Sequence, residues 1–116
     1  MGILHKKQVI FSVNFARLVT YVNNQPGYEA VIGEVARDPR IAKLNAEAGI
    51  GSRRSLHIDR LAGDLLNFKD DDYLTQTEDY EFAGTYWKSL HPDNRWGGDF
   101  RNKDGNHFSM GYEGRA

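Results

Sequence analysis

Four side chains in the second half of the sequence are of the types that hold and use a metal ion: His57, Asp64, Asp104 and His107. Two imidazoles and one carboxylate form a good zinc shell, and they leave one coordination position open for water. A second carboxylate that is not a ligand can then accept a proton from that water, whose pKa zinc lowers to about 7. The residue types therefore indicate metal-assisted hydrolysis.

The spacing of these residues places conditions on the fold. His57 and Asp64 are seven positions apart, so on a regular strand their side chains would lie on opposite faces. A bulge or bend, which Gly63 permits, would let both point to one ion. Asp104 and His107 are three positions apart, and a turn between them would bring the carboxylate beside the imidazole. A chain with four histidines and 16 acidic residues also contains such spacings by chance.

The other two histidines show no partner pattern. His5 is close to the N-terminus, and His91 precedes Pro92 at the predicted end of a helix, where an imidazolium suits the helix dipole. We expect structural roles for both.

Three predicted helices would pack on a small central antiparallel sheet, which makes the expected fold class α+β. A first helix is predicted over about 6–24 from apolar residues at three- and four-residue spacing, namely Val9, Phe11, Phe15, Leu18, Val19 and Val22. An N-capping Asp38 and a following proline predict a second helix that ends at Gly49. Thr77 is expected to cap a third helix that Pro92 stops, with an inner face of Phe82, Tyr86, Trp87 and Leu90.

The segments between these helices predict strands and turns. Residues 28–36 and 56–68 are expected as strands, the second of them buried. Residues 49–55 form a polar loop and residues 69–72 a charged turn, while glycines in 95–112 predict turns with one or two strands. The 116 residues contain no repeat and no linker, so residues 1–116 are expected to form one domain.

Composition narrows the classes of function. The chain has no cysteine, which excludes disulfides, thiolate nucleophiles and Cys-based zinc sites. The net charge is −1, whereas a general nucleic-acid binder would show a basic surplus. No signal-peptide core is visible and no apolar stretch is long enough to span a membrane. We therefore expect a protein that stays in the cytoplasm of the cell that makes it.

Two motifs, in order, carry a resemblance to a known family. Ser55-Leu56-His57, with Ala62 and Asp64 downstream, is similar to a Ser-x-His-x6-Asp signature, and Trp96-Gly97-Gly98-Asp99-Phe100 with Asp104-x-x-His107-Phe108 is similar to its second half. This signature is that of zinc peptidases of the D-alanyl-D-alanine carboxypeptidase and dipeptidase type. The version most similar to this chain is that of phage endolysins that act as L-alanyl-D-glutamate endopeptidases. The resemblance covers residues 35–109, and the two halves together are more specific than either alone.

The resemblance implies a hedgehog/DD-peptidase-like fold and a role for each motif residue. His57, Asp64 and His107 would be the ligands of Zn²⁺. Asp104 would be the general base, at a position where the dipeptidase branch has Glu. Arg37 resembles the family's arginine that stabilises the tetrahedral oxyanion, which a fixed guanidinium suits; the alternative is an ordinary surface or helix-capping arginine.

Three further residues are predicted to contact substrate. Ser55 matches a substrate-contacting serine of the family, or else makes a hydrogen bond within its loop. Arg60 stands where the family often has glycine, so a backbone kink is affected, and Gly63 is expected to supply flexibility in its place. Arg60 could also meet a substrate carboxylate. Trp96 is expected to form a cleft wall, with packing in the core as the alternative.

The resemblance also implies a biological setting. The expected reaction is hydrolysis of the L-alanyl-D-glutamate bond of bacterial peptidoglycan by an antibacterial phage endolysin. Such an enzyme would remain in the host cytoplasm until a membrane pore releases it, without a separate wall-binding domain or stable membrane association, and we expect a monomer. A D-alanyl-D-alanine carboxypeptidase with the same site is one alternative. A zinc-holding wall-binding module without catalysis is another, against which Asp104 argues, and a metal-free structural domain is the third.

Overall fold

The computed structural model describes residues 2–49 and 55–116, so most of the predicted loop 49–55 lies outside the described residues. The described part contains the helices α1 (Ile3–Asn23), α2 (Pro39–Glu47) and α3 (Glu81–Leu90), and the strands β1 (Tyr28–Ile32), β2 (Ala62–Lys69), β3 (Asp72–Tyr73), β4 (Asn94–Trp96) and β5 (His107–Met110). The strands form one antiparallel sheet. The predicted α+β class is therefore confirmed.

Strand β2 is the centre of the sheet. On one edge it pairs with β1, from Tyr28↔Lys69 to Ile32↔Leu65. On the other edge β5 pairs with the start of β2 and β3 with its end, and β4 pairs with the outer side of β5. Strand β2 therefore has hydrogen-bonded neighbours along both of its edges.

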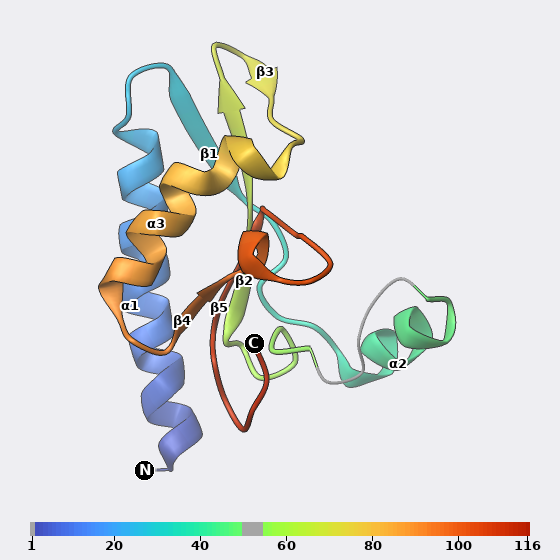
Figure 1. The fold of residues 1–116 in the computed structure, drawn as a ribbon. Coiled ribbons are helices and arrows are strands. Elements are labelled where there is room, and N and C mark those ends of the chain that lie inside the picture. Colours follow the sequence, from blue (N-terminus) through green and yellow to red (C-terminus); the bar gives the residue numbers. More distant parts are fainter. Residues whose placement is uncertain (1, 50–54) are drawn as a thin grey trace.

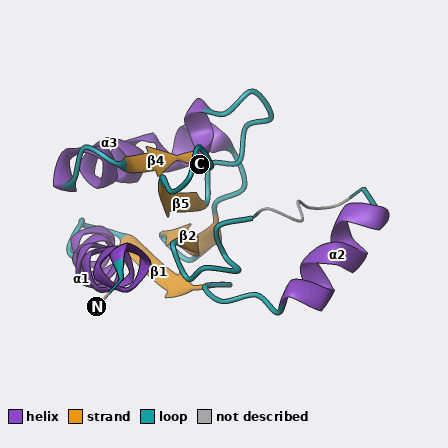
Figure 2. Cartoon of the chain, turned by 90° about the horizontal axis from the view of Figure 1, so that it is seen from below, coloured by secondary structure: helices purple, strands orange, loops and turns teal. Residues whose placement is uncertain are grey.

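Helices α1 and α3 lie side by side on one face of the sheet, and α2 lies apart from them across it (Figures 1 and 2). The rings of Phe11 and Phe15 on α1 meet the edge of the Trp87 ring on α3, with centroids 5.6 Å and 6.3 Å apart. The Trp87 indole N–H donates to the carbonyls of Arg95 and Ser109, so a fully buried tryptophan ties α3 to the sheet.

The helix predictions are largely confirmed, with shifted ends. Helix α1 begins at Ile3, and Val9, which was expected on its inner face, is 51% exposed. Asp38 caps α2 as predicted, because its Oδ1 accepts from the Arg40 amide at 2.8 Å. A 3₁₀ turn, η1 (Thr77–Tyr80), precedes α3, and its N-cap is Gln76 rather than Thr77. Of the predicted inner face of α3, Trp87 is fully buried, whereas Phe82, Tyr86 and Leu90 are partly buried against the core.

Two strand predictions were too long. Strand β1 ends at Ile32, before the predicted position 36. Residues 56–60 form turns rather than the first part of a strand, because the Leu61 amide bonds back to the Leu56 carbonyl at 2.9 Å. Among the described residues, no helix is long and apolar enough to cross a membrane.

Gly63 allows α1 to approach the sheet. A Cβ at this position would lie 2.5 Å from the Phe15 ring, so a larger residue would push the helix away. The expected role of Gly63 as a source of flexibility was therefore wrong, and its role is close packing. Since side chains alternate along a strand, Asp64 faces away from α1, toward the opposite side of the sheet.

Candidate metal centre

The structure brings His57, Asp64 and His107 together. Each offers one ligand atom, and these atoms all lie within 4.8 Å of one another. Asp64 Oδ1 is 3.4 Å from His57 Nε2 and 3.7 Å from His107 Nδ1. Tetrahedral zinc with bonds of about 2.1 Å has ligand atoms roughly 3.4 Å apart. The two distances fit that geometry, so the three side chains can hold a metal ion.

His57 and Asp64 do not lie on the same strand, so the seven-residue spacing does not place their side chains on opposite faces. Asp64 lies on β2, directly opposite His107 on β5, whereas His57 lies in the turn before β2. The expected bulge in a common strand was therefore wrong. Two hydrogen bonds hold the backbone of His57 in this turn. The backbone amide of Arg37 donates to the His57 carbonyl at 3.1 Å, and the backbone amide of His57 donates to Ser55 Oγ at 3.2 Å.

The polar atoms of the cluster fit a cation better than they fit one another. Asp64 Oδ1 is buried and makes no hydrogen bond to a described residue, although both imidazoles lie within 4 Å of it. His57 Nδ1 lies 3.1 Å from the Val35 carbonyl. If Nδ1 carries the proton for that bond, the lone pair of Nε2 points into the cluster, which is the usual support of a metal-binding histidine.

The electrostatics of the site favour a charged carboxylate. Burial alone would raise the pKa of Asp64, but the imidazoles of His107 and His57 outweigh it and hold this pKa at about 2. Burial also lowers the pKa of His57, but Asp64 and the Val35 carbonyl reverse the effect and leave it raised. Because a metal ion binds the neutral imidazole, metal binding competes with protonation of His57.

Asp104 lies next to this cluster without belonging to it. The predicted turn is present, with the His107 amide donating to the Asp104 carbonyl at 3.1 Å. The Asp104 amide donates to the Gly97 carbonyl at 2.9 Å, and a Cβ on Gly97 would lie 2.0 Å from the Asp104 carbonyl oxygen. The loop is thus fixed against η2 (Gly97–Asp99).

The carboxyl group of Asp104 is exposed at the edge of the site, yet nearby protein atoms remove part of its hydration. This loss of hydration raises the pKa of Asp104; the imidazole of His107 opposes the rise and the carboxylate of Asp64 adds to it. A carboxylate with a raised pKa is a better proton acceptor than an ordinary aspartate.

Arg37 is joined to His57 through the backbone bond described above and through Glu34. Its Nε donates to Glu34 Oε1 at 2.6 Å, and a second guanidinium nitrogen contacts the same oxygen. Glu34 Oε1 is also 3.8 Å from His57 Nδ1. Glu34 therefore connects the arginine to a candidate ligand and restricts the position of the guanidinium.

The comparisons with known proteins support the fold. The crystal structure of Serratia marcescens L-Ala D-Glu endopeptidase ChiX is similar, with a TM-score of 0.69 and 21% sequence identity, over 85% of this chain and 77% of that chain. Comparison with protein families and with curated protein sequences gives no match. The chain therefore shares the fold of that protein, and its three clustered side chains could hold a metal ion.

The three predicted substrate residues lie in different surroundings. Ser55 accepts the hydrogen bond from the His57 backbone amide described above, which is the alternative to substrate contact that the sequence left open for this residue. Arg60 is exposed, with a φ of 56°, and thus takes the left-handed conformation that glycine favours. Trp96 is only 6% exposed, and its indole N–H donates to the Gly105 carbonyl at 2.7 Å. Its surroundings match the packing alternative, and all three substrate contacts stay predictions.

Sequence reasoning missed the supporting groups. Glu34 received no role, although a carboxylate three positions before Arg37 is a visible signal for an ion pair. The Val35 carbonyl could not be found from side-chain types at all, because its contribution to His57 comes from the backbone. The ring centroid of Phe100 is 5.4 Å from that of His107. Phe100 lies within the second motif, but the sequence analysis did not predict that it contacts His107.

Proposed function

We propose that this protein is a zinc-dependent peptidoglycan peptidase that hydrolyses the L-alanyl-D-glutamate bond of the stem peptide. The observation that carries this proposal is the cluster of His57, Asp64 and His107 with Asp104 beside it. The fold shared with an L-Ala D-Glu endopeptidase supports the choice of substrate. A phage endolysin, acting as one monomeric domain that a membrane pore releases from the host cytoplasm, is the setting we infer from the sequence motifs.

The metal ligands would be His57 through Nε2, Asp64 through Oδ1 and His107 through Nδ1. Two imidazoles and one carboxylate favour zinc over magnesium or calcium, which prefer oxygen ligands. A bound zinc ion would polarise the scissile carbonyl and lower the pKa of a water molecule. Asp64 Oδ1 is buried without a hydrogen bond to a described residue, and such an ion would compensate its burial.

Asp104 would act as the general base and then as the general acid. Its carboxylate accepts a proton from the attacking water and delivers that proton to the nitrogen of the leaving amine. Both transfers require the carboxylate to reach the attacking oxygen and the leaving nitrogen. The position of Asp104 next to the cluster, outside the ligand group, suits this role.

Arg37 would stabilise the negative charge that develops on the carbonyl oxygen. A guanidinium is charged at every working pH and can donate two hydrogen bonds from one plane. Glu34 holds it in place before the substrate arrives, so little reorganisation is needed in the transition state. Ser55, Arg60 and Trp96 would contact the substrate around this centre.

The scissile bond separates this proposal from its alternative. Purified peptidoglycan incubated with the zinc-loaded protein should gain new amino-terminal glutamate, which dinitrophenyl labelling detects. Release of free D-alanine without new amino-terminal glutamate would instead support the D-alanyl-D-alanine carboxypeptidase. Tight wall binding by zinc-loaded protein with neither product would support the non-catalytic wall-binding module.

A further inference from the structure

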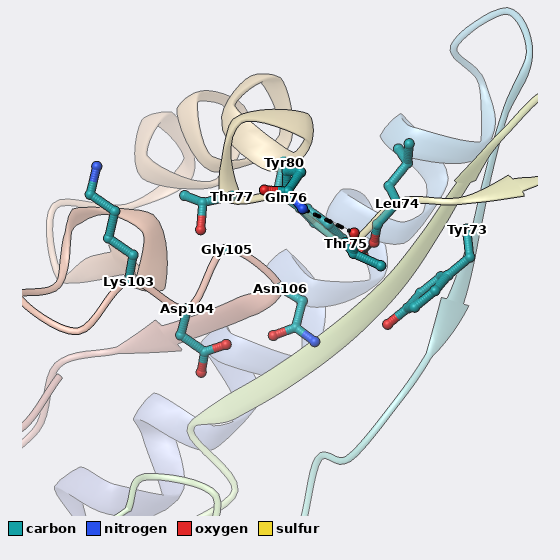
Figure 3. A pocket seen from close by; sticks show the side chains of 10 residues that line it. All are labelled: Tyr73, Leu74, Thr75, Gln76, Thr77, Tyr80, Lys103, Asp104, Gly105 and Asn106. Atoms are coloured by element: carbon teal, nitrogen blue, oxygen red, sulfur yellow. Dashed lines mark hydrogen bonds between the residues drawn. The ribbon is translucent and has the colours of Figure 1, made fainter.

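Two hollows in the surface of the protein differ in their place relative to the candidate metal centre. One, of about 220 Å³, is lined by Asp104 and by the segment between β3 and α3 (Figure 3), so it belongs to that centre. The other, of about 570 Å³, is an open groove between α1 and α3. These two helices cover the face of the sheet away from Asp64 (Figures 1 and 2). A ligand of this groove would therefore be bound apart from the metal centre.

The outer surface of α1 exposes apolar side chains to solvent. Of the nine large apolar side chains that are exposed in the described part of the protein, four belong to the first three turns of α1, namely Ile3, Val9, Ile10 and Val13. Residues three and four positions apart share one face of a helix. By this spacing Lys6, Ile10, Val13 and Arg17 form one outward stripe, in which two cations flank two apolar side chains.

This outer surface is also positively charged. Helix α1 contains no aspartate or glutamate in its 21 residues, and the lining of the groove contains none either. Lys7 is paired with Asp93. Lys6 and Arg17 are exposed and form no ion pair with any described residue. The two uncompensated cations favour an anionic partner.

The stripe does not suit a second copy of this chain. If two α1 helices packed antiparallel with Ile10 opposite Val13, Lys6 of one copy would lie opposite Arg17 of the other, because each cation lies four residues beyond that central pair. In parallel packing each cation would meet its own counterpart. Like charges across an interface are unfavourable. The exposed apolar side chains are also few beside the roughly 20–30 residues that each partner contributes to a stable protein interface.

An anionic lipid surface suits the same stripe. Separate apolar side chains can enter the boundary of the acyl chains, while the long stems of lysine and arginine let their charges reach the lipid phosphates. The rings of Tyr21 on α1 and Tyr86 on α3 stack with centroids 3.9 Å apart, and both line the groove together with Arg17. Tyrosine has an apolar ring and a polar hydroxyl, a combination that is favoured where headgroups meet acyl chains.

We propose that the outer surface of α1, together with the groove between α1 and α3, binds anionic phospholipid membranes. Lys6 and Arg17 would contact the lipid phosphates, and Ile10 and Val13 would enter the acyl boundary. The contact depends on a few charges and on shallow insertion, so it is reversible and weakens with salt, and it is not a stable membrane association. The proposal goes beyond the proposed function and does not depend on it.

The test is cosedimentation of zinc-loaded protein with vesicles at low salt. One set contains equal amounts of phosphatidylglycerol and phosphatidylcholine, and the other contains phosphatidylcholine alone. We expect the wild-type protein to bind only the anionic vesicles and to be released at about 0.5 M salt. The double variant Lys6→Glu, Arg17→Glu should bind at least tenfold more weakly. The matched control Lys43→Glu, Lys103→Glu makes the same charge change at exposed positions outside α1, and it should bind like the wild type.

A second pair of substitutions tests the apolar part of the contact. Ile10→Ser with Val13→Ser should weaken binding by about tenfold, because two apolar side chains no longer leave water. Both positions are exposed, so this variant and the Lys6→Glu, Arg17→Glu variant should unfold at the wild-type Tm. Lost binding at an unchanged Tm would then report the contact itself.

Several results would overturn the proposal. These are an absence of wild-type binding to anionic vesicles at low salt, and equal losses in the Lys6→Glu, Arg17→Glu variant and its matched control. Binding of poly-L-glutamate without binding of vesicles would instead make α1 a surface for an acidic protein. A dimer in sedimentation equilibrium without vesicle binding would indicate a second copy of this chain. Vesicle binding needs no catalysis, so its failure leaves the peptidase intact, and failure of the peptidase leaves vesicle binding to be measured.

Discussion

Asp64 and His107 lie directly opposite each other on β2 and β5, and Asp64 Oδ1 is 3.7 Å from His107 Nδ1. The register between β2 and β5 thus fixes the relative position of two of the three candidate ligands. A slip by one residue would turn Asp64 toward α1 and replace it with a neighbour that cannot bind metal. Packing of Gly63 against Phe15 opposes such a slip, so the core on one face of the sheet stabilises the site on the other.

Zinc should stabilise the protein through His57, Asp64 and His107. Binding at a hundredfold excess over Kd contributes about 2.7 kcal/mol, which should raise Tm by roughly 10 °C for a chain of this length. Asp64→Asn should remove this rise, while the exposed His5→Ala should keep it. Thermal unfolding followed by circular dichroism, with and without zinc, measures both. A zinc-dependent rise that persists in Asp64→Asn would place the metal elsewhere.

Glu34 should affect catalysis by positioning Arg37. Glu34→Gln weakens the contact that restricts the guanidinium, so we expect kcat to fall by about tenfold, less than the 100-fold or greater loss expected for Arg37→Ala. Zinc content and Tm with zinc should remain near the wild-type values. Glu29→Gln, an exposed carboxylate on β1, is the matched control. Wild-type kcat in Glu34→Gln would show that Arg37 needs no such support.

Gly84 should be required for the packing of α3 on the sheet. A Cβ at this position would lie 2.3 Å from the Trp96 ring, and such overpacking costs about 1–3 kcal/mol. Gly84→Ala should therefore lower the free energy of unfolding, measured in urea. Gly111→Ala, whose Cβ would have no neighbour closer than 3.4 Å, should have little effect. Because alanine favours helices, a stabilised Gly84→Ala would contradict the packing.

Arg60 should carry backbone strain that glycine relieves. A residue other than glycine in the left-handed region costs about 1–2 kcal/mol, and Arg60 has a φ of 56°. Arg60→Gly should therefore exceed Arg60→Ala in free energy of unfolding by about 1 kcal/mol. Denaturant unfolding of the two variants at one pH gives this difference. Equal stabilities would mean that the turn changes conformation in solution.

The sequence allowed the fold class, the helices and the clustered residues to be predicted, because each depends on periodicity or on motif order. The turn at 56–60 was missed for a physical reason. Leu56, Leu61 and Ala62 are apolar and fully buried, and a short apolar run looks the same in a buried turn as in a strand. The role of Glu34 and the pocket beside Asp104 depend on which loops meet, and local sequence does not contain that information.

The role of Asp104 is tested most directly by comparing wild-type protein and Asp104→Ala at equal zinc content. Purified peptidoglycan serves as substrate, and new amino-terminal glutamate is the product counted, with a chelator-treated wild-type sample alongside. We expect Asp104→Ala to bind zinc and to unfold at the wild-type Tm, with kcat lower by about 100- to 10,000-fold. Chelation should abolish turnover. Unchanged turnover by zinc-loaded Asp104→Ala would contradict the assignment of the base.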